Sequence, residues 1–430
     1  MEKVKLKREI GVIGFTAHMV NMVVGSGIFV LPAIVASGLG PSSVFAYLFC
    51  IVIVALVMLC FAEVGSRVAA SGGAYVYIRT AFGPYIGFLT SILFVWSTLA
   101  ADAAVANAIV DILGTQLPMF KWPPARMLVF FFLFLIFGFV NFRGAKHGVA
   151  VVKLATIAKL IPLLILIMAS WGDVAIENLE IQALPSFRKV AEMTLILFFA
   201  FQGAESALSI SGEVKNPQRT IPKGILVSIL IIFMLYVLVQ TVAQGVLGPT
   251  LPTYRENPLG AVAERVFGGF GFAAMTLAAL ISMLGYLGSS ILSMPRVLFQ
   301  AAVDGVLPME KLAKIHPRFS TPFMAIGSYA AIGFLCASFG GFEQLAIISS
   351  ATILLIYLGV SLAVIKLRMH DEEPRGGFKI PYGYGIPVLS SFVILCLLSH
   401  VAIDELIVIV VVVTLLTVFY FVRPYFRKNN

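Results

Sequence analysis

The chain alternates long apolar runs with short polar breaks, and this pattern predicts its elements. A helix that crosses a bilayer needs about 20 mostly apolar residues. We expect such helices at 12–37, 42–66, 84–112, 125–141, 149–170, 191–211, 223–247, 267–295, 322–339, 343–367, 385–401 and 404–422. Gly40-Pro41, Pro123-Pro124 and Asn216-Pro217 are typical of the turns between them. The pattern predicts an all-α integral membrane protein with twelve transmembrane helices, forming a single transmembrane domain over residues 1–430.

Composition agrees with this prediction and excludes other classes. Of the 430 residues, 60% are apolar and only 12% are charged, about half the charge of a soluble domain. An ordinary soluble enzyme and a disordered chain are both excluded. The four cysteines lie inside apolar runs without CxxC spacing, so we expect neither disulfides nor a zinc site. No metal and no cofactor is expected.

The basic excess of +9 is explained by topology. With the N-terminus inside, the outer loops hold few Lys and Arg, and the inner loops hold most of them. This bias is the positive-inside pattern, so nucleic-acid binding is not expected. We expect a multi-pass protein of the cytoplasmic (inner) membrane, in contact with the lipid bilayer and with both termini cytoplasmic; an oligomer is compatible with this. The outer basic residues are Lys121, Arg126, Arg188, Lys189, Arg255 and Arg265.

Two of the runs contain weak points for a helix. The first contains Gly25-Ser26-Gly27, and the sixth contains Gln202-Gly203. If 12–170 and 191–367 are two five-helix repeats and 385–422 adds two helices, these breaks occupy corresponding positions. Paired broken helices indicate a transporter site near the bilayer midplane, where helix ends meet a zwitterionic amino acid. The alternative is that the glycines only allow close helix packing.

Five segments form a recognisable series along the chain. They are Gly25-Ser26-Gly27-Ile28-Phe29-x-x-Pro32, Glu63…Ser71-Gly72-Gly73-Ala74-Tyr75, Phe82-Gly83-Pro84, Glu213-x-Lys215-Asn216-Pro217-x-Arg219-x-Ile221-Pro222 and Asp304-Gly305-x-Leu307-Pro308. Together, and in this order, they resemble the motifs of amino acid–polyamine–organocation (APC) transporters, in particular bacterial arginine/agmatine antiporters and proton-coupled amino acid permeases.

The resemblance implies a LeuT-type five-plus-five inverted repeat and a set of substrate contacts. The carboxylate would meet Ser26, Gly27 and Ile28, and the amine would meet carbonyls near Val23, Phe199 and Gln202. Three positions depart from the arginine/agmatine pattern and argue against arginine itself. Phe199 replaces an expected tryptophan, Gln202 an aliphatic residue and Ser290 an aromatic residue.

Ionisable residues inside the runs are candidate functional groups. The resemblance implies that the Lys159 ammonium takes the place of a sodium ion, and the alternative is that it reaches the headgroups. For Glu205 the resemblance implies gating or proton sensitivity, and the alternative is a structural bond to nearby backbone. Asp102, which we place in the outer third of the membrane, could attract a cationic side chain, carry a proton or be structural. We interpret His18 as an ordinary core residue.

These features favour secondary active transport of an amino acid or amine by alternating access, coupled to protons or to exchange. A cationic amino acid or polyamine antiporter is the main alternative, favoured by Asp102. An intramembrane enzyme would need motifs such as HExxH or GxSxG, and primary transport would need a phosphate-binding loop; the sequence has none of these. A channel or a transporter-like sensor is the remaining alternative, without rings of polar residues or a soluble output domain to favour it.

Overall fold

A computed structural model describes residues 10–67, 73–143, 148–208, 214–303, 307, 309–370 and 378–427, and regular structure in these ranges is helical apart from one bridge between Ile10 and Val214. The α-helices are α1 (Val12–Val23), α2 (Gly27–Leu39), α3 (Ser43–Arg67), α4 (Gly73–Phe82), α5 (Pro84–Gln116), α6 (Pro123–Arg143), α7 (Gly148–Ala169), α8 (Phe187–Leu197), α9 (Ala204–Ala207), α10 (Pro217–Leu247), α11 (Pro258–Val303), α12 (Phe323–Phe339), α13 (Phe342–His370), α14 (Gly385–Leu398) and α15 (Ile403–Arg427). Short 3-10 helices include η2 (Pro118–Lys121), η4 (Ile176–Leu179), η5 (Phe198–Phe201) and η7 (Gly248–Tyr254).

Each predicted apolar run is mainly helical where it is described, and the first and sixth runs are interrupted. Among the described residues, seven helical stretches are long and apolar enough to cross a membrane. The protein is therefore a multi-pass membrane protein. The count of twelve spans and the inverted repeat stay predictions.

Both expected helix breaks are present, and they touch each other. Helix α1 ends at Val23 and α2 begins at Gly27, while η5 ends at Phe201 and α9 begins at Ala204. Gly203 has a φ of +105°, and a Cβ atom there would lie 2.5 Å from the Met22 carbonyl oxygen. A Cβ atom on Gly27 would lie 2.6 Å from the Ala200 Cβ. Only glycine allows the two breaks to cross this closely.

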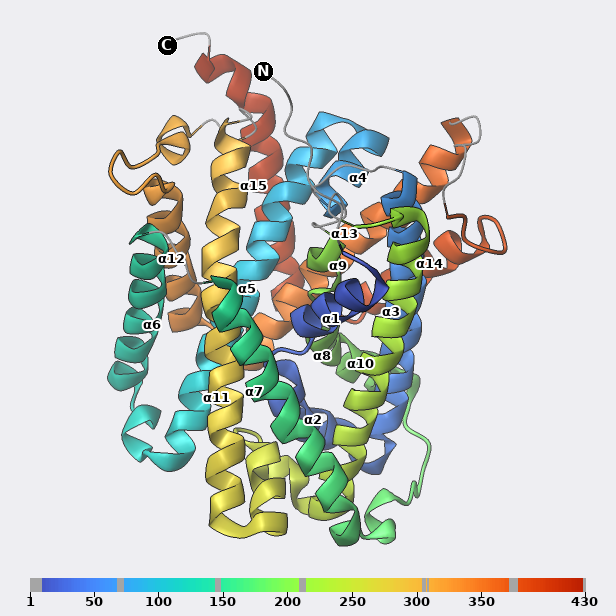
Figure 1. The fold of residues 1–430 in the computed structure, drawn as a ribbon. Helices are drawn as coiled ribbons and strands as arrows, with labels where there is room; N and C mark the ends of the chain where they lie inside the picture. Colours follow the sequence, from blue (N-terminus) through green and yellow to red (C-terminus); the bar gives the residue numbers. More distant parts are fainter. Residues whose placement is uncertain are drawn as a thin grey trace.

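The long helices run between two ends of the molecule (Figure 1). We call one of them the α4 end, because it carries α4 together with the C-terminal ends of α11 and α15. We call the other the η7 end, because it carries η7 and η2. Helix α5 runs between them and packs on α11, α12 and α13. The broken helices lie between these longer ones, so their exposed backbone is enclosed by protein (Figure 1).

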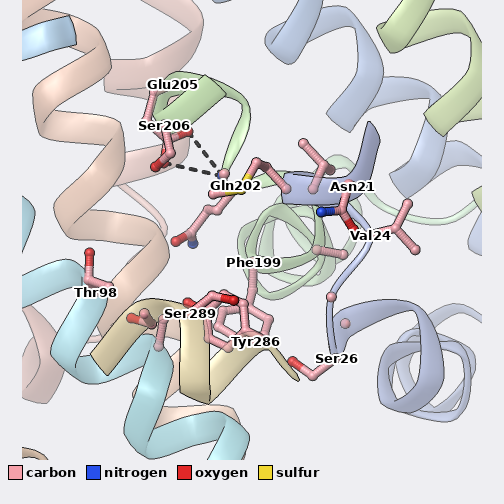
Figure 2. A pocket seen from close by; sticks show the side chains of 18 of the residues that line it. Asn21, Val24, Ser26, Thr98, Phe199, Gln202, Glu205, Ser206, Tyr286 and Ser289 are labelled. Carbon is pink, nitrogen blue, oxygen red and sulfur yellow. Dashed lines mark hydrogen bonds between the residues drawn. The ribbon is translucent and has the colours of Figure 1, made fainter. Parts of the chain in front are cut away.

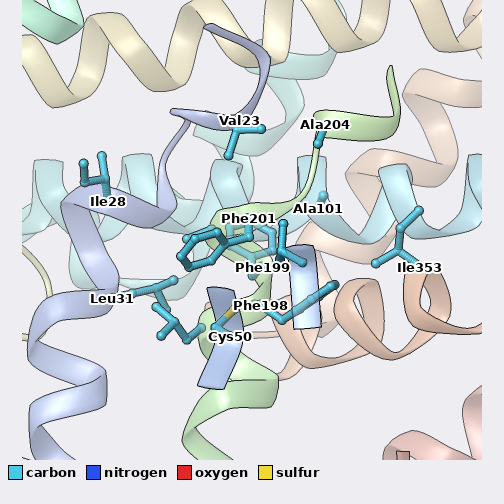
Figure 3. Packing of buried hydrophobic residues seen from close by; sticks show 14 of the residues in the cluster. Val23, Ile28, Leu31, Cys50, Ala101, Phe198, Phe199, Phe201, Ala204 and Ile353 are labelled. Carbon is cyan, nitrogen blue, oxygen red and sulfur yellow. The ribbon is translucent and has the colours of Figure 1, made fainter. Parts of the chain in front are cut away.

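The core is centred on the aromatic run of η5 (Figure 3). Phe198 and Phe201 are almost fully buried, and their rings meet Tyr357 of α13 and Tyr236 of α10 edge-on, at 5.9 and 4.9 Å between centroids. Edge-to-face aromatic pairs add directional stabilisation to burial. These contacts hold η5, which precedes the break, between α10 and α13.

The structure lengthens one expected helix and adds one element. Helix α5 continues to Gln116, so Asp102 lies near the middle of this helix, whereas the expected helix ended at 112. The added element is α4, in a segment predicted to be a loop. Several motif positions lie outside the described residues: Ser71, Gly72, Glu213, Asp304, Gly305 and Pro308.

Candidate functional site

A cavity of about 320 Å³ lies where the two breaks meet, enclosed further by α5, α7 and α11. Figure 2 shows Asn21 and Val24 on one side, Gln202 and Glu205 above, and Thr98 and Ser289 across from them. Of the ten predicted site residues, Ile28 and Asp102 do not line the cavity. The other eight do: Val23, Ser26, Gly27, Lys159, Phe199, Gln202, Glu205 and Ser290.

One pole of the cavity is the N-terminus of α2. The first N–H groups of a helix have no partner within it and favour an anion. Ser26 is the N-cap and its side chain makes no capping bond, so the first turn stays available. The Ile28 side chain packs in the core (Figure 3), which leaves only its backbone to serve the site.

Lys159 binds the end of the other half-helix. Its Nζ donates to the carbonyl oxygens of Asn21 at 2.7 Å and Val24 at 2.6 Å. Carbonyls at a helix C-terminus carry partial negative charge and favour a cation. The side chain is only 7% exposed, which disagrees with a lysine that reaches the headgroups.

Glu205 is bound by backbone at the break between η5 and α9. Both carboxylate oxygens accept from the Gly203 N–H, at 3.2 and 3.0 Å, and Oε2 accepts from the Tyr357 hydroxyl at 2.5 Å. This geometry agrees with a structural role for Glu205, because the carboxylate accepts from the backbone N–H that the break leaves without a helical partner. The residue also lines the cavity, so a substrate or a proton could reach it.

Gln202 links the break to α13. Its Nε2 donates to the Ser350 hydroxyl at 3.1 Å, and its Oε1 accepts from the Ser349 hydroxyl at 2.9 Å. Ser97 of α5 in turn donates to the Ser349 carbonyl at 2.9 Å. The amide therefore couples α5, α13 and the break through one network.

Asp102 lies behind the cavity wall. It is 0% exposed, and its Oδ2 accepts from the Ser290 hydroxyl at 2.9 Å and the Tyr329 hydroxyl at 2.8 Å. Oδ1 has no hydrogen-bond partner among the described residues. The carboxyl thus reaches the cavity through two residues that line it, Ser290 and Tyr286, whose hydroxyl also interacts with Asp102.

The cavity is closed towards the η7 end. Phe199 is 8% exposed and meets Phe342 edge-on at 5.6 Å between ring centroids. Beyond them Arg255 pairs with Glu343 at 3.3 Å. Towards the α4 end the lining continues through Ser293, which is exposed.

Sequence reasoning missed two residues of this region. Tyr236 donates to the Ala200 carbonyl at 2.7 Å and to the Val23 carbonyl at 3.2 Å, joining both broken helices. The signal was a tyrosine inside an apolar run, because a buried hydroxyl needs a partner. His18, interpreted as a core residue, lines the cavity.

Comparison with known proteins gives the family. The family model described as amino acid permease matches residues 10–426. The chain is 28% identical over 394 residues to the serine/threonine exchanger SteT of Bacillus subtilis (strain 168), covering 90% of this chain and 89% of that one. It is 27% identical over 406 residues to the branched-chain amino acid permease BcaP of the same organism, covering 91% and 86%.

A further relative is the methylthioribose transporter of Bacillus subtilis (strain 168), 25% identical over 410 residues, covering 90% of this chain and 87% of that one. The chain is similar to transporters over nearly its whole length. It is therefore a membrane transporter and not an enzyme. The protein belongs to the amino acid permease family, within the APC superfamily whose motifs its helix breaks and loops resemble.

Proposed function

We propose that this amino acid permease carries a neutral amino acid across the cytoplasmic membrane by alternating access, without sodium and driven by protons or by exchange. The observation that carries this proposal is the Lys159 ammonium on the carbonyls of Asn21 and Val24, beside the cavity. A bound cation at a broken helix end could neutralise the same carbonyls. The lysine supplies that positive charge from the chain itself.

The two helix ends suit a zwitterion. The substrate carboxylate would accept from the N–H groups at the start of α2, near Ser26 and Gly27. The ammonium group would meet carbonyl oxygens at the break between η5 and α9, near Phe199 and Gln202. Twelve helices in a five-plus-five inverted repeat would bring these breaks together by symmetry.

A neutral side chain fits better than a cationic one. The carboxylate nearest to the α5 and α11 wall is Asp102, which is 0% exposed and not in contact with the cavity. Glu205 is bound to Gly203 and Tyr357. Glu205 lines the cavity but would have to share its carboxylate between these donors and a substrate cation, so the antiporter of cationic amino acids or polyamines is the weaker candidate. The named substrates of two relatives, serine/threonine and branched-chain amino acids, are also neutral.

We place the α4 end in the cytoplasm. Arg79, Arg143, Arg219, Arg318 and Arg368 belong to helix ends and loops on that side. The η7 end carries acidic side chains such as Glu177, Glu256 and Glu343. This distribution follows the positive-inside rule. The structure would then represent an inward-open form.

Uptake into proteoliposomes tests the proposal. We expect saturable uptake of a labelled neutral amino acid, at a rate unchanged within about twofold when sodium is replaced by choline. Strict dependence on sodium would overturn the role of Lys159. No uptake of any amino acid, with correctly inserted protein, would overturn the proposed function as a whole.

The same vesicles separate the two driving forces. Uptake into empty vesicles under an imposed proton gradient indicates symport. Uptake that requires unlabelled amino acid inside the vesicle indicates exchange. Ser26→Leu should abolish either activity without loss of membrane insertion, because a bulky side chain would cover the start of α2; normal uptake would contradict this site.

A further inference from the structure

We propose that Asp102 is a positioning residue that makes Ser290 a hydrogen-bond acceptor, so that the carrier prefers amino acids with a side-chain hydroxyl. This inference rests on the proposed function and names its substrate class. The observation behind it is a fully buried carboxyl that accepts a hydrogen bond from Ser290, a serine that lines the substrate cavity.

A hydroxyl has one hydrogen to donate and two lone pairs to accept. Ser290 gives its hydrogen to Asp102 Oδ2 at 2.9 Å, and a carboxylate is a stronger acceptor than a neutral group. Tyr329 donates to the same oxygen. A proton bound by Asp102 would therefore sit on Oδ1, and Ser290 would still donate to Oδ2. What Ser290 offers to the cavity is a lone pair in either case.

Three neighbouring hydroxyls also present an acceptor oxygen to the cavity. The hydroxyl of Thr98 donates to the Phe94 carbonyl, that of Ser289 to the Gly285 carbonyl and that of Ser293 to the Ser289 carbonyl, each at 2.9 Å. All three line the cavity. These three hydrogens are committed to helix backbone, so Thr98, Ser289 and Ser293 present oxygen acceptors to the cavity around Ser290. Ser282 of α11, whose hydroxyl has no partner among the described residues, lies in the same lining and is the exception.

A substrate hydroxyl would complete this wall, whereas a methyl group would leave an acceptor unpaired. An unpaired buried acceptor costs about 1–3 kcal/mol. Ser290 differs from its neighbours because its bond runs to another helix, so the orientation of its hydroxyl depends on Asp102. Asp102 itself never touches the substrate.

Threonine and valine provide the test, because they have nearly the same shape and differ by a hydroxyl in place of a methyl group. We expect the wild type to take up threonine in preference to valine, measured as the ratio of the two initial rates in proteoliposomes. Ser290→Ala should lower that ratio roughly tenfold. Asp102→Ala should lower it several-fold, because the freed Ser290 hydroxyl can turn and donate.

Two variants separate positioning from folding. Tyr329→Phe removes the other bond to Oδ2 but leaves that of Ser290, so it should keep the ratio within about twofold. Asp102→Asn keeps an acceptor oxygen and should also keep most of the preference; it replaces Asp102→Ala if that variant does not fold. Thermal stabilisation by each amino acid provides a second readout.

The outcomes are distinguishable. Equal or greater uptake of valine by the wild type, an unchanged ratio in Ser290→Ala, or preferential uptake of lysine or arginine overturns this inference and leaves amino acid transport intact. An equal loss of ratio in Tyr329→Phe and Asp102→Ala would show general disruption and also overturns it. Absence of amino acid uptake overturns both proposals.

Discussion

Single residues supply the charge and the backbone freedom that the broken helices require. The Lys159 ammonium satisfies two carbonyls that no helix turn can satisfy. Gly203 lets η5 pass against the Met22 carbonyl. At this scale a substitution acts directly on the break.

Lys159→Ala should abolish uptake and lower stability. The change leaves the carbonyls of Asn21 and Val24 without their cationic donor, at a cost of about 1–3 kcal/mol each. We expect uptake to fall more than tenfold and the Tm of the purified protein in detergent to fall measurably. Lys189→Ala is the control, because that side chain is half-exposed and pairs with Glu192 on its own helix. Equal behaviour of the two variants would contradict the role of Lys159.

Gly203→Ala should disrupt the crossing of the breaks. A side chain there adopts a left-handed φ and meets the Met22 oxygen at 2.5 Å; the conformation alone costs about 1–2 kcal/mol. Reduced Tm and loss of uptake are expected. At Gly341→Ala, where a Cβ would meet nothing within 4 Å, both should stay near the wild-type values. A Gly203 variant as active and stable as Gly341→Ala would argue against this close crossing.

At the scale of elements, longer helices hold the broken ones in place. Helix α10 does so through Tyr236, whose hydroxyl bridges the carbonyls of Val23 and Ala200. Helix α13 does so through Ser349 and Ser350 on Gln202. These contacts place the helix ends at one cavity without using the hydrogen bonds of a regular helix.

Tyr236→Phe isolates the contribution of α10. The ring and its contact with Phe201 remain, and only the hydroxyl bonded to the two carbonyls is lost. We expect a loss of about 1–3 kcal/mol, measured as a lower Tm, and slower uptake. Tyr254→Phe, at an exposed position of η7, should change neither quantity. Unchanged stability in Tyr236→Phe would show that α10 does not hold the breaks through this hydroxyl.

At the scale of the whole molecule, one side of the cavity is closed and the other is accessible. Phe199, Phe342 and the pair of Arg255 with Glu343 separate the cavity from the η7 end. Ser293 is exposed on the α4 side. Alternating access requires that this asymmetry reverse during transport.

Cysteine labelling tests both orientation and access. With Cys336 and Cys396 replaced by Ala, Ser293→Cys should react with a membrane-impermeant maleimide at least roughly tenfold faster in inside-out vesicles than in intact spheroplasts. Tyr254→Cys should show the opposite preference. The native Cys50 and Cys60 are buried and should stay unlabelled. Reaction of Ser293→Cys only from the outside would reverse the topology.

Helix content and the two breaks could be predicted because they depend on local composition. Apolar length predicts the spans, and Gly25 to Gly27 and Gln202-Gly203 predict the interruptions. Helix α4 and the full length of α5 could not be predicted as reliably. Both depend on how the chain packs beyond the apolar run. The place of Asp102 along α5 depends on the full length of that helix.

By itself the sequence determined a helical membrane protein, the positions of its broken helices and most of the residues at its cavity. The physical reason is that a bilayer penalises every polar or backbone group that lacks a partner, so such groups mark the site wherever they occur. Only the tertiary structure decided the partners. It set Lys159 on the α1 carbonyls, Tyr236 across both breaks and Asp102 behind Ser290, because these contacts join helices that lie far apart in the chain.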